Sequence, residues 1–425
     1  MIIILTKMKN LILIILMILF SLAGLAQTSL EDCINSALDS HPALKNRESL
    51  ELINQKELEN NRIHGFPSLN IGGQGKYQSD VVEFDFNLPF EGIIFPEIPH
   101  FQYNLSLNAN QILYDGGQRK LKKDLLIFEH QERIARLDAA AREIKESVQK
   151  LYLDILLKNK QLDVIQLVQE SLDANLARLE AGYDGGVVTE MDVMLLEAEK
   201  IDIRRKELSL REARNALIQQ LSLISKLDIG LDETFIVPEV NYFEQAPERS
   251  EYDIFNYRNQ ALQVRKKMTG LKSVPRLSAF GQAGYGRPGL NFMSDKWQDF
   301  YVMGLQFSWI PWDYRETKRN QAMLDLNTSM LNNERENFDL QLQSAIDRVL
   351  NRIQLLEQII REDENMVGVR ESIRLKMEKR LSQGVITSAD YITELNREKE
   401  ARLDLEGSKL ELLANKLAYQ IIIGK

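Results

Sequence analysis

The chain has 425 residues, of which 27% are charged, and its formal net charge is −9. This acidic excess argues against a nucleic-acid partner, because nucleic acid requires a basic face. The single cysteine, Cys33, excludes a disulfide framework and a cysteine zinc cluster, and the four histidines lack the spacing of metal ligands.

Residues 1–26 have the pattern of a secretory signal peptide. Lys7 and Lys9 precede an unbroken apolar run, residues 11–20, and small residues then lead to Ala26. The apolar run is too short for a comfortable membrane span. We expect export with cleavage after Ala26, which removes two lysines and no acid and changes the net charge from −9 to −11. An uncleaved N-terminal anchor is the alternative.

A first structural repeat is expected over residues 27–226. It begins with helix-forming sequence, residues 30–63, interrupted at Pro42. Two alternating segments follow at 67–78 and 101–113, in which apolar or small residues alternate with Asn, Gln, Ser and Lys. A period of two predicts strands with one apolar and one polar face.

Two helices complete this repeat. From Gln118 up to Gly182 there is no proline or glycine, which predicts a helix of about 65 residues, on the order of 100 Å long. A glycine-containing turn follows, and a second helix is expected to run back over residues 190–226. Apolar residues at helical spacing indicate that these helices pack on one another.

The same plan is repeated in the second half of the chain. An inter-repeat segment, residues 227–249, precedes a second repeat over 250–425, with strands at 275–286 and 299–310 and another long helical hairpin. Asp115 and Asp313 stand 198 positions apart. A period of this length is too long for a solenoid unit and indicates two copies of one element.

The strands are long enough to cross a bilayer when tilted. A sheet in lipid has no tolerated open edge, so four strands must close by oligomerisation, as eight in a dimer or twelve in a trimer. A soluble sheet packed on one face is the alternative. Four aromatic residues near strand ends are candidates for the membrane interface: Trp297, Tyr301, Trp309 and Trp312.

The two turns between long helices are written alike, as GGVVTEMDV (185–193) and QGVITSADY (383–391). Each gives a glycine, then a Thr at the position of an N-cap and an Asp three residues later. Gly186 and Gly384 supply backbone freedom for the reversal. The T-x-x-D spacing predicts a capping box in each turn.

Together with LEDCINSALDSHPALK at the mature start and LYDGGQRK at the first strand-to-helix junction, these turns resemble the TolC-type outer-membrane efflux channels. The resemblance covers essentially the whole mature chain. It implies a mainly α protein with membrane β: a homotrimer whose twelve-stranded β-barrel continues as a long α-helical periplasmic tunnel. At the second junction, Trp312-Asp313-Tyr314-Arg315 replaces the Asp-Gly-Gly sequence, which leaves the backbone turn open there.

The resemblance also implies a function. The chain would be a passive exit duct in the outer membrane, in contact with its lipid. It would dock to a periplasmic adaptor (a membrane fusion protein) and, through it, to an inner-membrane RND pump or ABC exporter. The alternatives are a periplasmic coiled-coil adaptor and an envelope structural protein.

The resemblance places candidate residues at the two turns. Asp390 falls on a gate aspartate, whereas the next gate acid would be Thr393. The gate and pore candidates are Asp390, Asp192, Thr387, Thr189 and Glu190. The candidates for adaptor contact are Gly186, Val187, Val188, Gly384, Val385 and Ile386.

No catalytic pattern appears in the sequence. GQAGYG (281–286) superficially matches a phosphate-binding glycine loop, but it lies within an alternating strand and no helix follows it. We expect no enzyme, no metal and no cofactor. The transported substrate is not indicated by the sequence.

Overall fold

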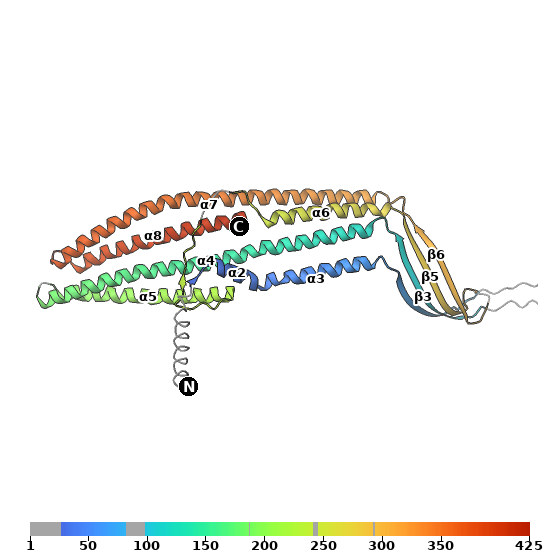
Figure 1. Cartoon of the computed structure of the whole chain (residues 1–425), viewed down its shortest axis with the longest axis horizontal. Helices are drawn as coiled ribbons and strands as arrows, with labels where there is room; N and C mark the ends of the chain where they lie inside the picture. The colour runs from blue at the N-terminus through green and yellow to red at the C-terminus, as the bar shows by residue number, and fades with distance from the viewer. Residues whose placement is uncertain (1–26, 82–97, 187, 241–244, 292–293) are drawn as a thin grey trace, which may run out of the picture. The chain divides into compact units, whose positions relative to one another are not determined.

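The computed structural model describes residues 27–81, 98–186, 188–240, 245–291 and 294–425 (Figure 1). The expected signal peptide, residues 1–26, and the adaptor candidate Val187 lie outside the described residues.

The elements follow the duplicated plan that the sequence predicts (Figure 1). The first half contains α2 (Leu30–Ser40), α3 (Pro42–Ile63), β2 (Ser68–Tyr77), β3 (Phe101–Tyr114), α4 (Gln118–Asp184) and α5 (Glu190–Ser225). The second half contains α6 (Ser250–Gly270), η1 (Leu271–Ser273), β5 (Arg276–Arg287), β6 (Gln298–Ser308), α7 (Glu316–Ser382) and α8 (Ser388–Ile423). Two short strands, β1 (Gln27–Thr28) and β4 (Thr234–Phe235), pair in parallel.

The sequence-based bounds of the strands differ from the observed ones by at most two residues. The fourth strand, expected at 299–310, runs from Gln298 to Ser308 because Pro311 and the following turn end the pairing earlier. The helical sequence before the first strand breaks at His41, whose backbone is extended, as expected for a residue that precedes proline. Of the helices whose residues are described, none is both long and apolar enough to cross a membrane.

The chain forms two compact units. The helical unit comprises the described residues up to Asn46 together with Arg136–Ser250 and Asn337–Lys425, and the sheet unit comprises Arg47–Ala135 and Glu251–Glu336. Each unit therefore takes segments from both halves of the sequence. The two predicted repeats concern the order of the elements along the sequence and do not coincide with the two compact units. The predicted bounds of the repeats stay a prediction.

The sheet unit contains one antiparallel sheet in the order β2-β3-β5-β6. The pairing of β3 with β5 joins the two halves of the chain. The register places most of the apolar residues of the four strands on one face, since Ile71 pairs with Leu107 and Ala279 with Leu305. The register shift between Ile112 and Tyr114 marks a bulge at the end of β3.

Two phenylalanine–glycine pairs hold β5 and β6 together on the opposite, polar face. Phe280 lies opposite Gly304, and Phe300 lies opposite Gly284. A Cβ atom on Gly304 or Gly284 would stand 2.8 Å or 2.5 Å from the facing ring, so each glycine leaves the space that a ring occupies.

The helical unit has two apolar clusters. The first surrounds Tyr152, whose hydroxyl lies 2.7 Å from the carbonyl oxygens of Thr28 and Ile236 and so ties β1 and β4 to α4. Cys33 is fully buried in this cluster, and burial, with Asp32 and Glu233 nearby, raises the pKa of its thiol to about 12. The second cluster surrounds Tyr391 close to the two turns.

Candidate functional site

The two turns, called here the first tip (residues 185–189) and the second tip (residues 383–387), lie in the helical unit. Gly186 and Gly384 have φ angles of 74° and 68°, in the left-handed region that glycine adopts without steric strain. At the second tip the Gly384 amide donates to the Leu381 carbonyl at 2.9 Å, and the Val385 amide donates to the Arg380 carbonyl at 3.0 Å. These bonds satisfy carbonyl groups at the end of α7 and reverse the chain.

Both returning helices begin with the predicted threonine cap. Thr189 Oγ1 accepts from the amide of Asp192, and Thr387 Oγ1 accepts from the amide of Asp390, each at 3.3 Å. At the second tip the capping box is complete, because Asp390 Oδ2 accepts from the Thr387 amide at 3.1 Å. Asp390 is exposed, and its bonds with Thr387 lower the pKa of its carboxyl.

Asp192 has an additional partner at the first tip. Its Oδ2 accepts from the Thr189 hydroxyl at 2.6 Å, while its Oδ1 accepts from the backbone amide of Ser388 at 2.9 Å. Partial burial raises the pKa of Asp192, but the hydrogen bonds from Thr189 and Ser388 outweigh burial, so its pKa is lowered overall. The first tip is thereby bonded to the first residue of α8.

The apolar tip residues differ in exposure. Val188 and Ile386 are half-buried against the cluster around Tyr391, whereas Val385 is 58% exposed. A Cβ atom at Gly182 would lie 2.7 Å from the Val188 Cγ2 atom, so the absence of a side chain at Gly182 leaves room for Val188. Glu190 is exposed at the start of α5. Among the described apolar candidates, Val385 presents the largest free surface.

A buried polar group behind the tips was not predicted from the sequence. Tyr391 is fully buried, and its hydroxyl lies 2.9 Å from Ser171 Oγ and accepts from Asn175 Nδ2 at 2.8 Å. Burial raises the pKa of this hydroxyl. The group joins α8 to α4, helices from different hairpins. Its only sequence signal is a tyrosine next to the capping aspartate.

A charged cluster lies beside this group. Arg374 bonds Glu378 at 2.8 Å and Glu398 at 2.5 Å, and Glu378 also pairs with Arg178 of α4. Burial alone lowers the pKa of Arg374, but the two carboxylates more than offset burial, and its pKa is raised. Ion pairs of this kind fix α4, α7 and α8 in register near the tips.

The four predicted interface aromatics lie at the ends of the sheet. Trp297 stacks on Tyr103 and Tyr285, with ring centroids 5.9 and 5.3 Å apart. Tyr301 is 74% exposed on the apolar face of β6, and Trp312 is 69% exposed beyond its other end. The indole of Trp309 donates to the Ser273 carbonyl at 3.0 Å.

The second strand-to-helix junction has the same left-handed backbone as the first. Gly116 and Gly117 have φ angles of 68° and 91°, and Tyr314 and Arg315, 198 positions later, have 51° and 64°. The sequence did not determine the conformation of this turn. The structure shows that it forms without glycine, at a cost of roughly 1–2 kcal/mol each for Tyr314 and Arg315.

The preceding aspartates make equivalent bonds. Asp115 accepts from the amides of Gly117 and Arg119 at 2.8 and 3.1 Å, and Asp313 accepts from the amide of Thr317 at 2.7 Å. In both halves, this aspartate satisfies free amides at the start of a long helix. Burial raises the pKa of Asp115, but the bonds from Arg119 and Gly117 prevail and lower it.

Within the described part of the chain, no group of three or more His, Cys, Asp and Glu side chains is placed to hold a metal ion. The functional groups that the tips present are hydrogen-bonding carboxylates and the exposed apolar side chain of Val385.

Comparison with known proteins gives a family and a fold. Residues 33–225 match the family model of the outer membrane efflux proteins. No curated protein matches the sequence. The outer membrane protein VceC from Vibrio cholerae is 15% identical, with a TM-score of 0.70 over 93% of this chain and 96% of that chain. The CmeC outer membrane channel of Campylobacter jejuni is 12% identical, with a TM-score of 0.70 over 93% and 85% of the two chains.

The open state of the MtrE outer membrane channel of Neisseria gonorrhoeae is 14% identical, with a TM-score of 0.68 over 93% of this chain and 88% of that chain. At these identities the likeness establishes a shared fold, which includes strands and long helices from both halves. The family match and the shared fold confirm the predicted resemblance.

Proposed function

We propose, from the premise that residues 33–225 belong to the outer membrane efflux protein family, that this protein is the outer-membrane channel of a tripartite export system. It is a passive exit duct, located in the outer membrane with a large periplasmic portion. It performs no catalysis, and its adaptor and pump determine which cargo reaches it.

The observation that carries this proposal is the exposed apolar face of the sheet. Leu69, Ile71, Met303 and Leu305 are between 67% and 76% exposed. Leaving such side chains in water forfeits on the order of 1.5–3 kcal/mol each relative to full burial. An apolar surface of this kind on a monomer marks contact with lipid or protein. Here it is matched by a polar opposite face rich in Asn, Gln and Ser, as in a barrel that spans a membrane around water.

Exposed aromatic residues at both ends of the sheet support the same reading. Near the helices stand Phe66, Tyr114, Trp309, Trp312 and Tyr314, and at the far end stand Tyr77, Phe101, Trp297 and Tyr301. Trp and Tyr are favoured where lipid meets water, because one end of the ring is apolar and the other is polar. The strands between the two zones have 10 to 14 residues, which is long enough to cross a bilayer core when tilted.

The edges of the sheet support a trimer. Among the described residues, β2 and β6 each pair on one side only. An open edge in lipid leaves backbone groups without partners, so copies of the sheet must join edge to edge. Twelve strands from three copies leave room for an aqueous channel, whereas eight strands enclose an interior that side chains fill.

The tips are the proposed site for gating and for docking a periplasmic adaptor, and through it an RND pump or ABC exporter. Exposed Val385 and the glycine turns at Gly186 and Gly384 offer the docking surface. Asp390, Asp192, Thr387, Thr189 and Glu190 offer the polar constriction. An adaptor or a structural coiled coil would need no sheet with an exposed apolar face, so both alternatives are disfavoured.

Membrane fractionation, followed by measurement of the mass of the detergent-solubilised complex, tests the proposal. We expect the protein in the outer-membrane fraction, as a complex of three copies. Recovery as a monomer, or as a protein that is soluble without detergent, would overturn it.

A further inference from the structure

The polar face of the sheet has an unusual charge composition. Its polar residues are almost all uncharged Asn, Gln and Ser, as the strand register shows. The charged residues on this face of the four strands are Lys76 and Arg276. No Asp or Glu of the four strands lies on this face. In a chain with a net charge of −9, a face with cations and no acid is a distinct feature.

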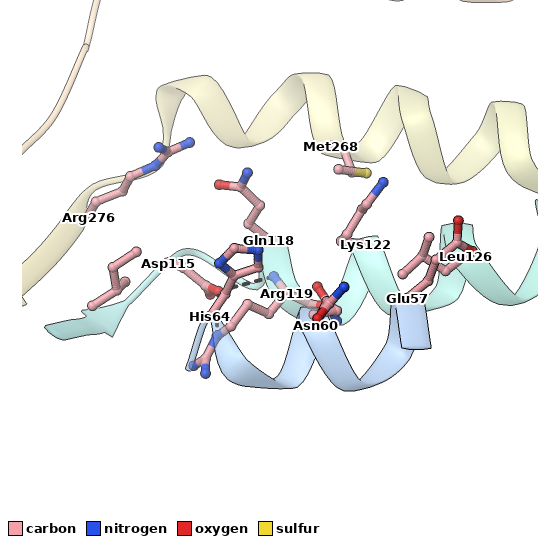
Figure 2. A pocket seen from close by; sticks show the side chains of 12 residues that line it. Glu57, Asn60, His64, Asp115, Gln118, Arg119, Lys122, Leu126, Met268 and Arg276 are labelled. Carbon is pink, nitrogen blue, oxygen red and sulfur yellow. Dashed lines mark hydrogen bonds and ion pairs between the residues drawn. The ribbon is translucent and has the colours of Figure 1, made fainter. Parts of the chain in front are cut away.

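A pocket of about 610 Å³ continues this face beyond the strands. It lies in the sheet unit, where α3, the start of α4 and the end of α6 converge (Figure 2). Ile112 and Arg276 are its two strand residues. Ile112 pairs with Ser278 and Arg276 pairs with Ser308, so both belong to the polar face. The pocket is therefore bordered by the face of the sheet that the proposed channel turns to its lumen.

The acids of the pocket are already paired. Glu57 accepts from Arg133 at 3.0 Å, and Asp115 accepts from Arg119 Nε at 3.0 Å. In the part of the chain that the structure describes, no carboxylate lies within ion-pair distance of Lys122 or Arg276. Among the described residues, Lys122 of α4 and Arg276 at the start of β5 thus line the pocket without an ion-pair partner.

Neutral donors accompany these cations. Gln118 and Lys122 extend from α4 toward α6, while Asn60 lies on α3 and His64 lies in the turn that follows α3 (Figure 2). A guanidinium, an ammonium and amide groups around one pocket are the donors that proteins use to hold phosphate and carboxylate groups.

We propose that this pocket is a binding site in the duct for small anions with phosphate or carboxylate groups, and that Lys76 extends the same preference toward the far end of the sheet. The inference rests on the proposed function, because the polar face becomes a lumen only in a closed barrel. Cations from three copies would surround one water-filled passage and raise the local concentration of anionic cargo. The exposed carboxylate of Asp390 would give the opposite preference at the tips.

Single-channel recording of the full-length complex in a planar bilayer tests this site. Inorganic tripolyphosphate, in buffer free of divalent cations, is added on the side of the sheet's far end. We expect a concentration-dependent block of the current. The variants Lys122→Gln and Arg276→Gln should each weaken the block about fivefold, and the double variant more, since each removes one unit charge from the site.

Lys120→Gln is the matched control. Lys120 lines a different groove, with Arg62 and Lys123, and its substitution removes the same charge at nearly the same level of α4. We expect the block to be unchanged in Lys120→Gln and retained in Lys122→Arg. Absence of block in the unmodified channel, or an equal block in the double variant, would overturn the anion site while leaving the channel function standing. A complex that forms no channels would overturn both.

Discussion

Asp192 Oδ1 accepts a hydrogen bond from the backbone amide of Ser388 at 2.9 Å, which joins the start of α5 to the start of α8. Asp390, the equivalent aspartate 198 positions later, uses its carboxylate on its own cap, Thr387. Two residues with the same spacing therefore have different structural roles. Asp192 connects the two hairpins, and Asp390 is exposed and free to face a pore.

Substitution of Asp192 should loosen the closed arrangement of the tips. Loss of a partly exposed hydrogen bond to a carboxylate is worth on the order of 1 kcal/mol, which shifts a closed-to-open equilibrium roughly fivefold. We expect Asp192→Ala to raise the time-averaged conductance or antibiotic leakage by about this factor, and Asp192→Asn, which keeps an acceptor oxygen, to do so less.

Asp390→Ala should also raise conductance if three exposed carboxylates form a constriction. Unchanged conductance and leakage in both alanine variants would reduce the two aspartates to helix caps.

The same bonds predict a dependence on pH. The pKa values of Asp192 and Asp390 are both lowered from an ordinary value of 3.8 by hydrogen bonds to their charged forms. Their stabilising contribution is therefore fully present above pH 3.8 and is lost as the pH falls through the lowered values. We expect the tips to be stable from pH 7 to about 4 and to open below this range, measured as conductance in bilayers.

The Asp192→Asn/Asp390→Asn double variant is the control for this transition. It carries no titrating tip carboxylate at these positions, so its conductance should stay level where that of the unmodified channel rises. A transition of the same size in the double variant would assign the pH dependence to other groups.

The left-handed turn at the second junction predicts a stabilising substitution. Arg315 has a φ of 64°, which a side chain disfavours by about 1 kcal/mol and glycine does not. Arg315→Gly should raise the free energy of unfolding by roughly that amount, while leaving the Trp312–Tyr314 ring contact in place. Gly116→Ala should do the reverse, because its φ is 68° and the new Cβ atom would lie 2.7 Å from Val274 Cγ1. Thermal unfolding of the detergent-solubilised complex measures both, and a destabilised Arg315→Gly variant would contradict the argument.

Much of this architecture could be predicted from the sequence, because it is written in local patterns. Alternation located the strands to within two residues, and the absence of proline and glycine located the long helices. Threonine caps followed from spacing alone. The bond from Ser388 to Asp192 and the buried Tyr391 group could not be found this way, because they join segments about 200 residues apart. The left-handed Tyr314 and Arg315 were missed because their residue types disfavour that backbone.

Cys33 provides a probe of the helical unit because it is the only cysteine of the chain. It has no exposed surface, and burial raises the pKa of its thiol to about 12, so few thiolates form at neutral pH. We expect a maleimide reagent at pH 7.5 to leave the native complex unlabelled and to modify Cys33 completely in denaturant. Rapid labelling under native conditions would show that the cluster around Tyr152 opens readily.

The buried Tyr391 hydroxyl should contribute measurably to the stability of the tips. Tyr391→Phe keeps the ring in its apolar cluster but removes the partner of Ser171 Oγ. It also removes one of the two acceptors of Asn175 Nδ2, which donates to the Ser171 carbonyl at 2.8 Å as well, and Asn175 is only 2% exposed. A buried polar group that loses its partner costs about 1–3 kcal/mol. Hydrogen exchange should therefore become faster along α4 near residue 175 and along the first turns of α8. Tyr183→Phe, at an exposed position of α4, is the matched control and should leave exchange unchanged. Equal exchange in the two variants would mean that water replaces the hydroxyl at no cost, and that apolar packing alone holds the two hairpins together.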